Sequence, residues 1–468
     1  MEVSLFGTSQ FGKSSNVSSQ KRLNCYVEMG QDDRNQYAVY GTPGLDLFGS
    51  FGDTPIRGIW KKGNLIYVVH RGTFYEVNNS GIKTVRGTIA TTAGNVYMAD
   101  NGKQLMLTDG TLTGGYIYDF NTLVFVKISS PNYPGAATVC FQDSFFIINP
   151  PNSQTFYTSG IYNGLTWQAL DFASAEANPD NIVRVDSDNS TLYLWGEITT
   201  EFWTNSGAQD FSFRRISGGS TEWGLAAVNS VCKFDNSLAF LGKSRMGQVI
   251  VARMTGYLPQ RISTPELEYI INNYSATSDA TSFSYMLGGH PMLQINFTTG
   301  NQSWLYDGLT QIWSQVQSYN IGRHRAELGI EYLNKIIVTD YAIGNLYRLN
   351  PLSYTDNGDP IIMELISRHI SKDDKRITID KLQLDMETGV GLVSGQGVNP
   401  QIMLSISKDG GHEYLTTIWA TFGAIGKYLQ RAIWWQLGQS RDWTFKFRIS
   451  DPVKRVIFGS SIDMRIDK

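Results

Sequence analysis

The sequence has little charge and few cysteines. Charged residues make up 17% of its 468 residues, against about 25% in typical globular chains. Its three cysteines, Cys25, Cys140 and Cys232, are far apart and form no CxxC pair. The sequence therefore predicts neither a disulfide framework nor a zinc site, and fits a protein made in a reducing cytoplasm.

Long apolar runs are also missing. No run approaches the ~18 residues that a membrane-spanning helix needs. The N-terminus, MEVSLFGTSQFGKSS, does not place an apolar core behind a basic region as a secretory signal does. We therefore expect neither membrane insertion nor a secretory signal. The formal net charge of −3 gives no global basic field that would draw the chain to nucleic acid.

Glycine and aromatic residues are abundant. The chain has 46 glycines, 14 prolines and 12% aromatic residues. This composition is typical of packed strands joined by tight turns, and it argues against a disordered chain.

One pattern recurs along most of the chain: an apolar strand, a polar or glycine turn, and a second strand rich in aromatic residues. Copies begin at Asn64, Lys103, Asp143, Ser190, Asn236, His290 and Asn334. They start about 40 to 54 residues apart, in the range of β-propeller blades. Short strands such as IRGIW and LVFVKIS supply the third and fourth strands of a four-stranded blade. The alternative is a large β-sandwich or several small ones, which need no constant period.

We therefore predict an all-β fold with three regions. Residues 1–50 form an N-terminal arm and a propeller-closing segment, and residues 51–355 form a propeller of about six or seven blades. The stretch Ser263–Tyr274 has apolar residues at helical spacing and predicts a helical insertion. Residues 356–468 carry longer alternating strands and predict a C-terminal β-sandwich.

Two motif matches have the wrong context for catalysis. Gly7–Ser14 satisfies the P-loop pattern G-x-x-x-x-G-K-[ST], but neither a preceding buried strand nor a following helix is predicted there. Ser407–Tyr414 resembles the Asp-box turn of sialidases, in which Asp409 would accept turn N–H bonds while Gly410 and Gly411 take positive φ. The box occurs once, outside the propeller, so it predicts a hairpin.

Other site patterns are incomplete. The stretch Asp186–Asn189 begins like a calcium loop but lacks the glycine and closing glutamate, so we interpret it as a polar turn. No HExxH or GxSxG motif occurs. Carboxylates are numerous, but the sequence neither shows nor excludes a glycosidase pair. We predict no catalytic, cofactor-binding or metal-binding residues, and therefore no cofactor and no enzyme activity.

Two features suggest interaction surfaces. Basic clusters lie at Arg214–Arg215, at Arg323–Arg325 and at Lys454–Arg455, with Arg441, Lys446 and Arg448 nearby. They are either solvated faces or contacts with an acidic partner or a DNA backbone. Trp434 and Trp435 are adjacent, so a strand would place one in the core and the other outside as a candidate interface anchor.

The order of several motifs resembles the packaged-DNA stabilisation proteins of short-tailed, podovirus-type phages, also called tail accessory factors or tail nozzle or hub proteins. The motifs are RLNCYVEM, YGTPGLDLF, TTEFWTNSGA, ELEYIINNYS, LQLDMETGVG, IMLSISKDGGHEY and the terminal FKFRIS and SIDMRI. The Gly-Thr-Pro-Gly turn is an ordinary one, so the shared order carries the resemblance. The family is not an enzyme family, so it supplies no catalytic residues.

The resemblance implies a structural part of the virion tail that is assembled in the host cytoplasm. Such proteins form an oligomeric ring, usually a homohexamer, below the portal and its adaptor ring, the head-to-tail connector. The ring extends the DNA channel, helps to retain packaged DNA and acts in DNA ejection. It also provides attachment for a tail needle or plug and for tailspike or fibre proteins. Contact with DNA in the lumen would be non-specific, and a mildly acidic chain suits such a conduit.

Two other functions compete with this one. The first is a propeller-type glycan-binding or glycoside-hydrolysing receptor-recognition protein, because aromatic-rich propeller faces bind sugars. The second is a P-loop NTPase, which would require nucleotide binding that depends on Lys13.

Overall fold

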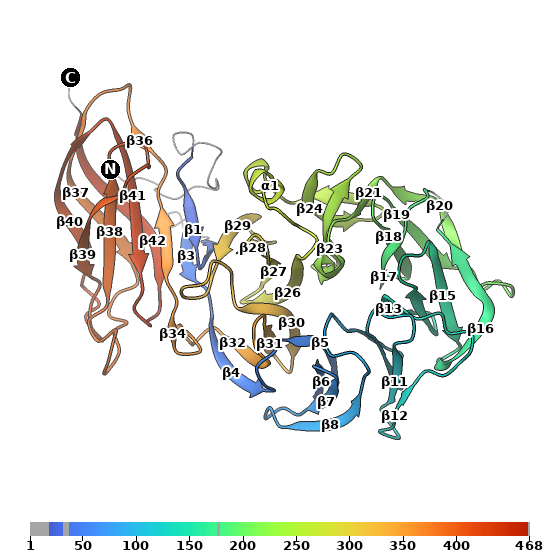
Figure 1. Ribbon diagram of the computed structural model, residues 1–468. Coiled ribbons are helices and arrows are strands. Elements are labelled where there is room, and N and C mark those ends of the chain that lie inside the picture. The colour runs from blue at the N-terminus through green and yellow to red at the C-terminus, as the bar shows by residue number, and fades with distance from the viewer. Residues whose placement is uncertain (1–17, 31–36, 176–177, 467–468) are drawn as a thin grey trace.

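The computed structural model describes residues 18–30, 37–175 and 178–466. Figure 1 shows a ring of radially arranged sheets beside a two-layered β-domain. The predicted β-propeller and C-terminal β-sandwich are both confirmed. Within the described residues, seven sheets make up the ring. The P-loop match at Gly7–Ser14 lies outside the described residues.

The first four blades are four-stranded antiparallel sheets whose strands follow one another in sequence from the centre of the ring to its rim (Figure 1). Blade 1 contains β5 (Ile56–Lys62), β6 (Leu65–His70), β7 (Thr73–Val77) and β8 (Lys83–Thr88). Blade 2 contains β9 (Tyr97–Asp100), β10 (Gln104–Thr108), β11 (Gly115–Asp119) and β12 (Phe125–Lys127). Blade 3 contains β13 (Thr138–Gln142), β14 (Phe145–Asn149), β15 (Thr155–Gly160) and β16 (Asn163–Ser174). Blade 4 contains β17 (Ile182–Asp188), β18 (Thr191–Gly196), β19 (Thr200–Asn205) and β20 (Phe213–Thr221).

The remaining blades carry additions. Blade 5 contains β21 (Trp223–Leu225), the 3₁₀ turn η1 (Val228–Ser230), β22 (Cys232–Phe234), β23 (Ser237–Ser244), β24 (Val249–Thr255) and β25 (Leu258–Arg261). Blade 6 contains β26 (Thr281–Leu287), β27 (His290–Phe297), β28 (Gln302–Asp307) and β29 (Ile312–Val316). Blade 7 contains β30 (Ala326–Tyr332), β31 (Lys335–Asp340), β32 (Asn345–Asn350) and, as its fourth strand, β4 (Gly44–Ser50). The short strands β33 (Thr355–Asp356) and β34 (Asp359–Pro360) extend blade 7 beyond β4.

The seven hairpins read from the sequence are the two middle strands of successive blades, from β6–β7 to β31–β32. Aspartates at strand ends fix several turns. Asp307 Oδ1 accepts a hydrogen bond from the N–H of Leu309 at 2.9 Å, and Asp340 Oδ1 accepts one from the N–H of Ala342 at 2.7 Å. Such side-chain bonds to the following backbone favour a tight turn over continued strand.

The predicted helical insertion is α1 (Pro265–Asn272), between blades 5 and 6. Thr264 caps it, because its Oγ1 accepts a hydrogen bond from the N–H of Leu267, and Pro265 stands in the first turn, where no N–H is needed. Leu267 and Ile271 lie one turn apart and bury the same helix face in the core between blades 5 and 6. Among the described residues, no helix is both long and apolar enough to cross a membrane.

The sandwich packs two sheets around a single apolar core. One layer contains β2 (Cys25–Met29), β3 (Tyr37–Gly41), β42 (Val456–Ile466), β37 (Ile377–Met386) and β40 (Ala432–Ser440), in that order. The other contains β1 (Lys21–Leu23), β35 (Met363–Ile366), β41 (Asp442–Ile449), β38 (Gln401–Ser407) and β39 (Leu415–Thr421), with β36 (Ile370–Ser371) on β41. Three N-terminal strands thus complete a domain formed mainly by the other end of the chain.

Strand β1 joins the two domains. It pairs in parallel with β29 of blade 6, where Leu23 lies opposite Gln315, and antiparallel with β35 of the sandwich, where Leu23 lies opposite Glu364. Blade 6 and one sandwich layer are therefore one ten-stranded sheet. Lys21 and Arg448 flank Glu364 at 3.3 Å and 2.5 Å and tie β1, β35 and β41 together. This continuous pairing fixes the orientation of the sandwich relative to the propeller.

Candidate functional site

Side chains from three blades meet across the propeller axis. Tyr97 of blade 2 donates a hydrogen bond from its hydroxyl to Asn229 Oδ1 of blade 5 at 2.6 Å. The Arg184 guanidinium of blade 4 lies 5.7 Å from the centre of the Tyr97 ring and donates to the carbonyl of Val228 at 2.7 Å. Burial raises the pKa of Tyr97 to about 12, so its phenol keeps the proton that it donates. Blades 3 and 4 stand between blades 2 and 5 in the ring, so the bridge links inner parts of blades that are not neighbours.

An ion pair between Arg184 and Asp186 supports this bridge. Arg184 binds Asp186 through two parallel bonds, Nε to Oδ2 at 2.8 Å and Nη2 to Oδ1 at 2.9 Å. A two-pronged geometry fixes the guanidinium more firmly than a single bond. Asp186, Ser187 and Asp188 are the last residues of β17 and pair with β18, and the turn begins only at Asn189, with φ 48°. The interpretation of the Asp186–Asn189 stretch as a polar turn is therefore wrong for its first three residues, which continue the strand, and holds for Asn189.

Several cations read as surface clusters lie inside the fold. Arg323 is 2% exposed and pairs with Glu327. Arg455 is also buried and donates to the carbonyl of Ile361 at 2.6 Å, and burial lowers its pKa to about 10. His324 is half-buried, and its partial removal from water lowers its pKa. For Arg323 and Arg455 both interpretations, a solvated face and a partner contact, are wrong, because sequence spacing does not reveal the contacts that bury them. Arg214 and Arg215 of β20 are exposed.

The Ser407–Tyr414 stretch forms the predicted hairpin between β38 and β39. Asp409 Oδ1 accepts the N–H groups of His412 and Glu413, both at 3.1 Å, and the hydroxyl of Ser407 at 2.5 Å. These bonds, that from Ser407 first, hold the pKa of Asp409 below its usual value. Gly410 and Gly411 take φ of 77° and 85°, as a turn of this shape requires. Asp409 is thus a turn-forming carboxylate.

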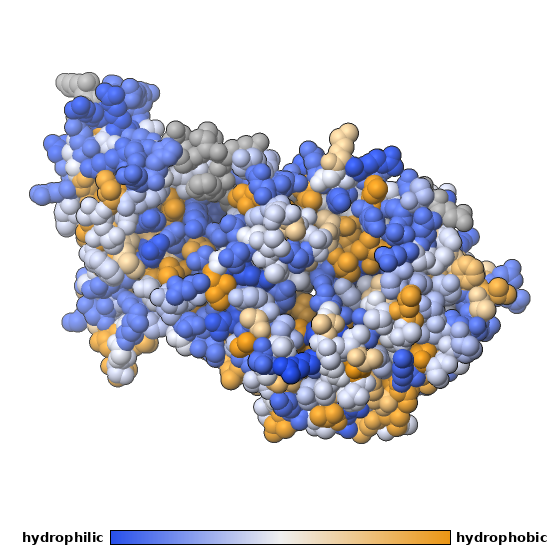
Figure 2. All heavy atoms as spheres, in the orientation of Figure 1, coloured by the Kyte–Doolittle hydropathy of each residue, from blue (hydrophilic) through white to orange (hydrophobic). Residues whose placement is uncertain are grey.

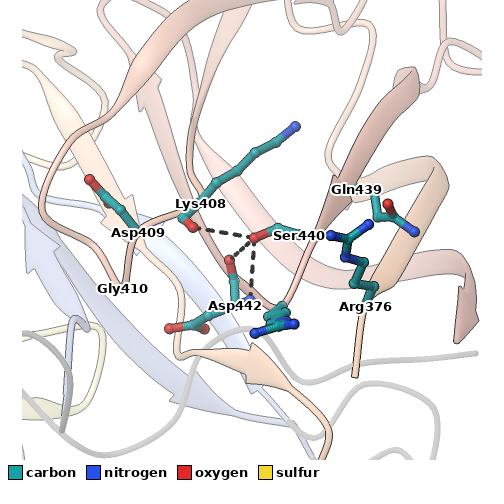
Figure 3. A pocket seen from close by; sticks show the side chains of 8 residues that line it. Arg376, Lys408, Asp409, Gly410, Gln439, Ser440 and Asp442 are labelled. Carbon is teal, nitrogen blue, oxygen red and sulfur yellow. Dashed lines mark hydrogen bonds between the residues drawn. The ribbon is translucent and has the colours of Figure 1, made fainter. Parts of the chain in front are cut away.

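A groove of about 530 Å³ lies beside this hairpin, lined by Arg376, Lys408, Asp409, Gly410, Gln439, Ser440, Arg441 and Asp442. Figure 3 shows Lys408 and Arg376 extending to different sides of the groove, with Ser440 between Lys408 and Asp442. Lys408 Nζ donates to the carbonyl of Leu437 at 3.1 Å and lies 4.8 Å from the Trp443 ring centre. The side chains of Lys408 and Arg376 do not converge on one point, so the groove is not a preformed anion-binding site.

The tryptophan prediction is confirmed. Trp434 is 2% exposed and donates from its indole N–H to the carbonyl of Ile418, whereas Trp435 is 64% exposed on the opposite face of β40. Lys381 Nζ lies 5.5 Å from the centre of the Trp435 ring. Trp435 belongs to a larger exposed apolar surface, which we call the sandwich edge: strand β39, the loop 422–431 and Trp435. Its large exposed residues are Leu415, Ile418, Trp419, Ile425, Tyr428, Leu429 and Trp435.

A second apolar surface lies on the rim of the propeller, on β16 and the turn before it, and we call it the β16 surface. Its large exposed residues are Ile161, Tyr162, Leu165, Leu170 and Phe172. Figure 1 places β39 and β16 at opposite ends of the molecule, and Figure 2 shows hydrophobic spheres near both ends. Apolar patches of this kind mark interaction surfaces more often than catalytic sites. Sequence reasoning found Trp435 but neither of the two surfaces as a whole.

Comparison with protein families matches two adjacent parts of the chain. Residues 10–354 match the family model described as the β-propeller of bacteriophage P22 Gp10, and residues 362–465 match the model described as its β-sandwich. No curated protein matches the sequence.

Solved structures similar to this chain include one that is described as a β-propeller. The WD40 β-propeller domain of Doa1 is 14% identical, with 65% of this chain and 96% of that chain covered and a TM-score of 0.38. The designed Ika8 protein is 12% identical, with 71% and 99% covered and a TM-score of 0.40. U3-55K is 10% identical, with 66% and 99% covered and a TM-score of 0.42.

Proposed function

The chain belongs to the bacteriophage P22 Gp10 family and is therefore a phage structural protein, and from this we propose that it is the nozzle or hub of a short-tailed phage's tail. The resemblance read from the sequence is confirmed, and the matched residues cover both domains. This match over most of the chain is the observation that carries the proposal. In this role the chain assembles with other virion proteins and has no catalytic activity.

The proposed working form is a ring of copies, six by the family resemblance, below the portal and adaptor ring. The Tyr97–Asn229 bridge supports a ring, because a hydrogen bond between blades 2 and 5 is not compatible with a DNA duplex running through the middle of a single propeller. A conduit for the genome then has to be the lumen between copies. In that arrangement each propeller is a wall element of the channel.

The continuous sheet through β29, β1 and β35 suits such a wall element. A conduit that helps to hold packaged DNA must resist deformation, and strands paired across a domain boundary resist it better than a flexible linker does. The formal charge of −3 leaves the lumen without a strong global attraction for phosphates. We therefore propose non-specific DNA contact, with retention supplied by the closed assembly together with a needle or plug.

The proposed partners are the portal–adaptor complex on one side of the ring, and the needle or plug and tailspike or fibre proteins elsewhere on it. Assembly takes place in the host cytoplasm, and the protein ends up in the virion tail. The test is to mix the purified full-length chain with purified portal–adaptor complex and to measure the mass of the product. The proposal predicts that several copies add to each complex. A complex whose mass does not change would contradict it.

A further inference from the structure

The sandwich edge is an open β-edge. In the part of the chain that the structure describes, β39 pairs with β38 alone and β40 pairs with β37 alone. Five consecutive residues of β39, Leu415 to Trp419, are exposed. An uncovered edge with apolar side chains is a site where another chain adds, and monomeric proteins protect such edges. The loop beyond β39 extends the surface, since Leu429 is 95% exposed.

The β16 surface is the second open edge. Strand β16 is the outermost strand of blade 3 and pairs with β15 alone among the described residues. The pairing with β15 shifts register between Tyr157 and Ser159, so Gln168 to Asp171 of β16 bulge outward. Leu170 on this bulge is 80% exposed. It therefore projects from the propeller rim as an apolar knob.

The charges on the two surfaces are opposite. Between Leu415 and Arg431 the charged residues are Lys427 and Arg431, both basic and both exposed. In β16 the charged residue is Asp171, next to Leu170. Basic side chains around one apolar surface and an acidic one within the other would attract in the correct pairing, while two copies of the same surface would not.

We propose that the sandwich edge of one copy docks on the β16 surface of a second copy of this chain, head to tail, and that this contact closes the ring. The proposal rests on the ring proposed above. A ring of identical chains needs two different complementary surfaces on each copy, and the two surfaces lie at opposite ends of the molecule (Figure 1). Apolar side chains supply the buried area, and Asp171 with Lys427 and Arg431 sets the pairing.

Cross-linking tests the contact directly. Gln430 and Gln168 are exposed residues of the two surfaces, and Gln430→Cys and Gln168→Cys leave the proposed apolar and charged contacts in place. Cys25 and Cys140 are buried and Cys232 is partly buried. We therefore expect little cross-linking of these native cysteines by a short bismaleimide. On portal–adaptor complexes, the double variant is expected to give a ladder of linked copies. A mixture of the two single variants is expected to give linked pairs and nothing larger.

Two results would overturn the contact. One is a double variant that joins the complex in the normal number of copies yet does not cross-link. The other is a single variant that cross-links to itself, because that requires a symmetric contact. If the unmodified chain does not join the complex at all, the proposed function fails instead, so the two failures are distinguishable.

Charge reversal gives an independent test that needs no cross-linker. Asp171→Lys alone, and Lys427→Glu with Arg431→Glu, are each expected to weaken ring assembly at least tenfold, and the three changes together are expected to restore it. Matched controls are Arg214→Glu on the neighbouring blade and Arg441→Glu at the groove, both exposed and outside the two surfaces. They are expected to leave assembly unchanged. Additive weakening, without restoration in the combined variant, would contradict the pairing.

Discussion

Leu45 lies directly opposite Leu349, so a strand near the N-terminus closes the blade formed by the last propeller repeat. Leu45 is almost fully buried, in the core that blade 7 shares with blade 6. Leu45→Ala should therefore lower the free energy of unfolding by about 2–4 kcal/mol. Denaturant unfolding of the purified chain measures it.

The same strand provides the control. Leu47 is exposed, so Leu47→Ala should change the free energy of unfolding by no more than about 0.5 kcal/mol. Equal losses for the two variants would show that β4 is not held in the ring as the structure describes.

The ion pairs of Glu364 with Lys21 and Arg448 should make the stability of the contact between the two domains depend on pH. Burial opposes its ionisation, but Lys21 and Arg448 outweigh burial and hold the pKa of Glu364 below its ordinary value of 4.5. A carboxylate with a lowered native pKa stabilises the fold above the unfolded pKa and loses that effect as the pH falls through the native pKa. Glu364→Gln should cost about 1–2 kcal/mol at pH 7, and the difference from the unmodified chain should shrink below pH 4.5.

Unfolding in denaturant between pH 7 and pH 3 measures this dependence. A difference that stays constant over the whole range would mean that the charge of Glu364 contributes nothing. Asp380, whose exposed partner is Arg465, is the surface control: Asp380→Asn should have a small effect at every pH.

The Tyr97–Asn229 hydrogen bond allows its effect on the stability of the propeller to be tested separately from any effect on the path of the DNA. Tyr97→Phe removes the bond to Asn229 and should cost about 1–2 kcal/mol of unfolding free energy. If DNA passes between copies, phage carrying Tyr97→Phe should retain and eject their genome normally at permissive temperature. Particle yield, DNA content and ejection rate measure this. Faster DNA loss from tails of unchanged thermal stability would place the DNA path on the propeller axis.

Trp434 and Trp435 are neighbours on β40, but their replacement should affect different properties of the protein, stability in one case and ring assembly in the other. Trp434 is buried in the sandwich core, so Trp434→Ala should cost about 3–5 kcal/mol of unfolding free energy. Trp435→Ala should leave stability within about 1 kcal/mol but weaken ring assembly about tenfold, because exposed tryptophans anchor interfaces. Unfolding and assembly on portal–adaptor complexes are measured for both variants. Unchanged assembly in Trp435→Ala would remove Trp435 from the interface.

Much of the fold was predictable because each blade repeats a local signal. A hairpin such as β6–β7 places two apolar strands around a turn within a few residues, and its recurrence reveals the blade. The helix α1 was predictable for the same reason, since its cap at Thr264 and its buried Leu267 and Ile271 are neighbours in sequence.

Features that depend on distant pairing were not predictable. The exposure of β39 was not predictable, because Thr416 takes φ 48° and the register with β38 shifts beside it, so the apolar residues of this strand do not alternate. Nothing near Cys25 in the sequence shows that β2 packs in the core of the C-terminal sandwich. Arg323 and Arg455 resemble surface cations until the fold supplies Glu327 and the Ile361 carbonyl.

The central claim is that this chain is a tail ring whose lumen, and not its propeller axis, carries the genome. Electron cryo-microscopy of the intact virion tail, with this chain located in the map, tests that claim most directly. We predict a ring of copies below the portal and adaptor, DNA density in the space between copies, and the bridge from Tyr97 to Asn229 intact in every propeller. A tail that lacks this chain, or DNA density along a propeller axis, would contradict the account.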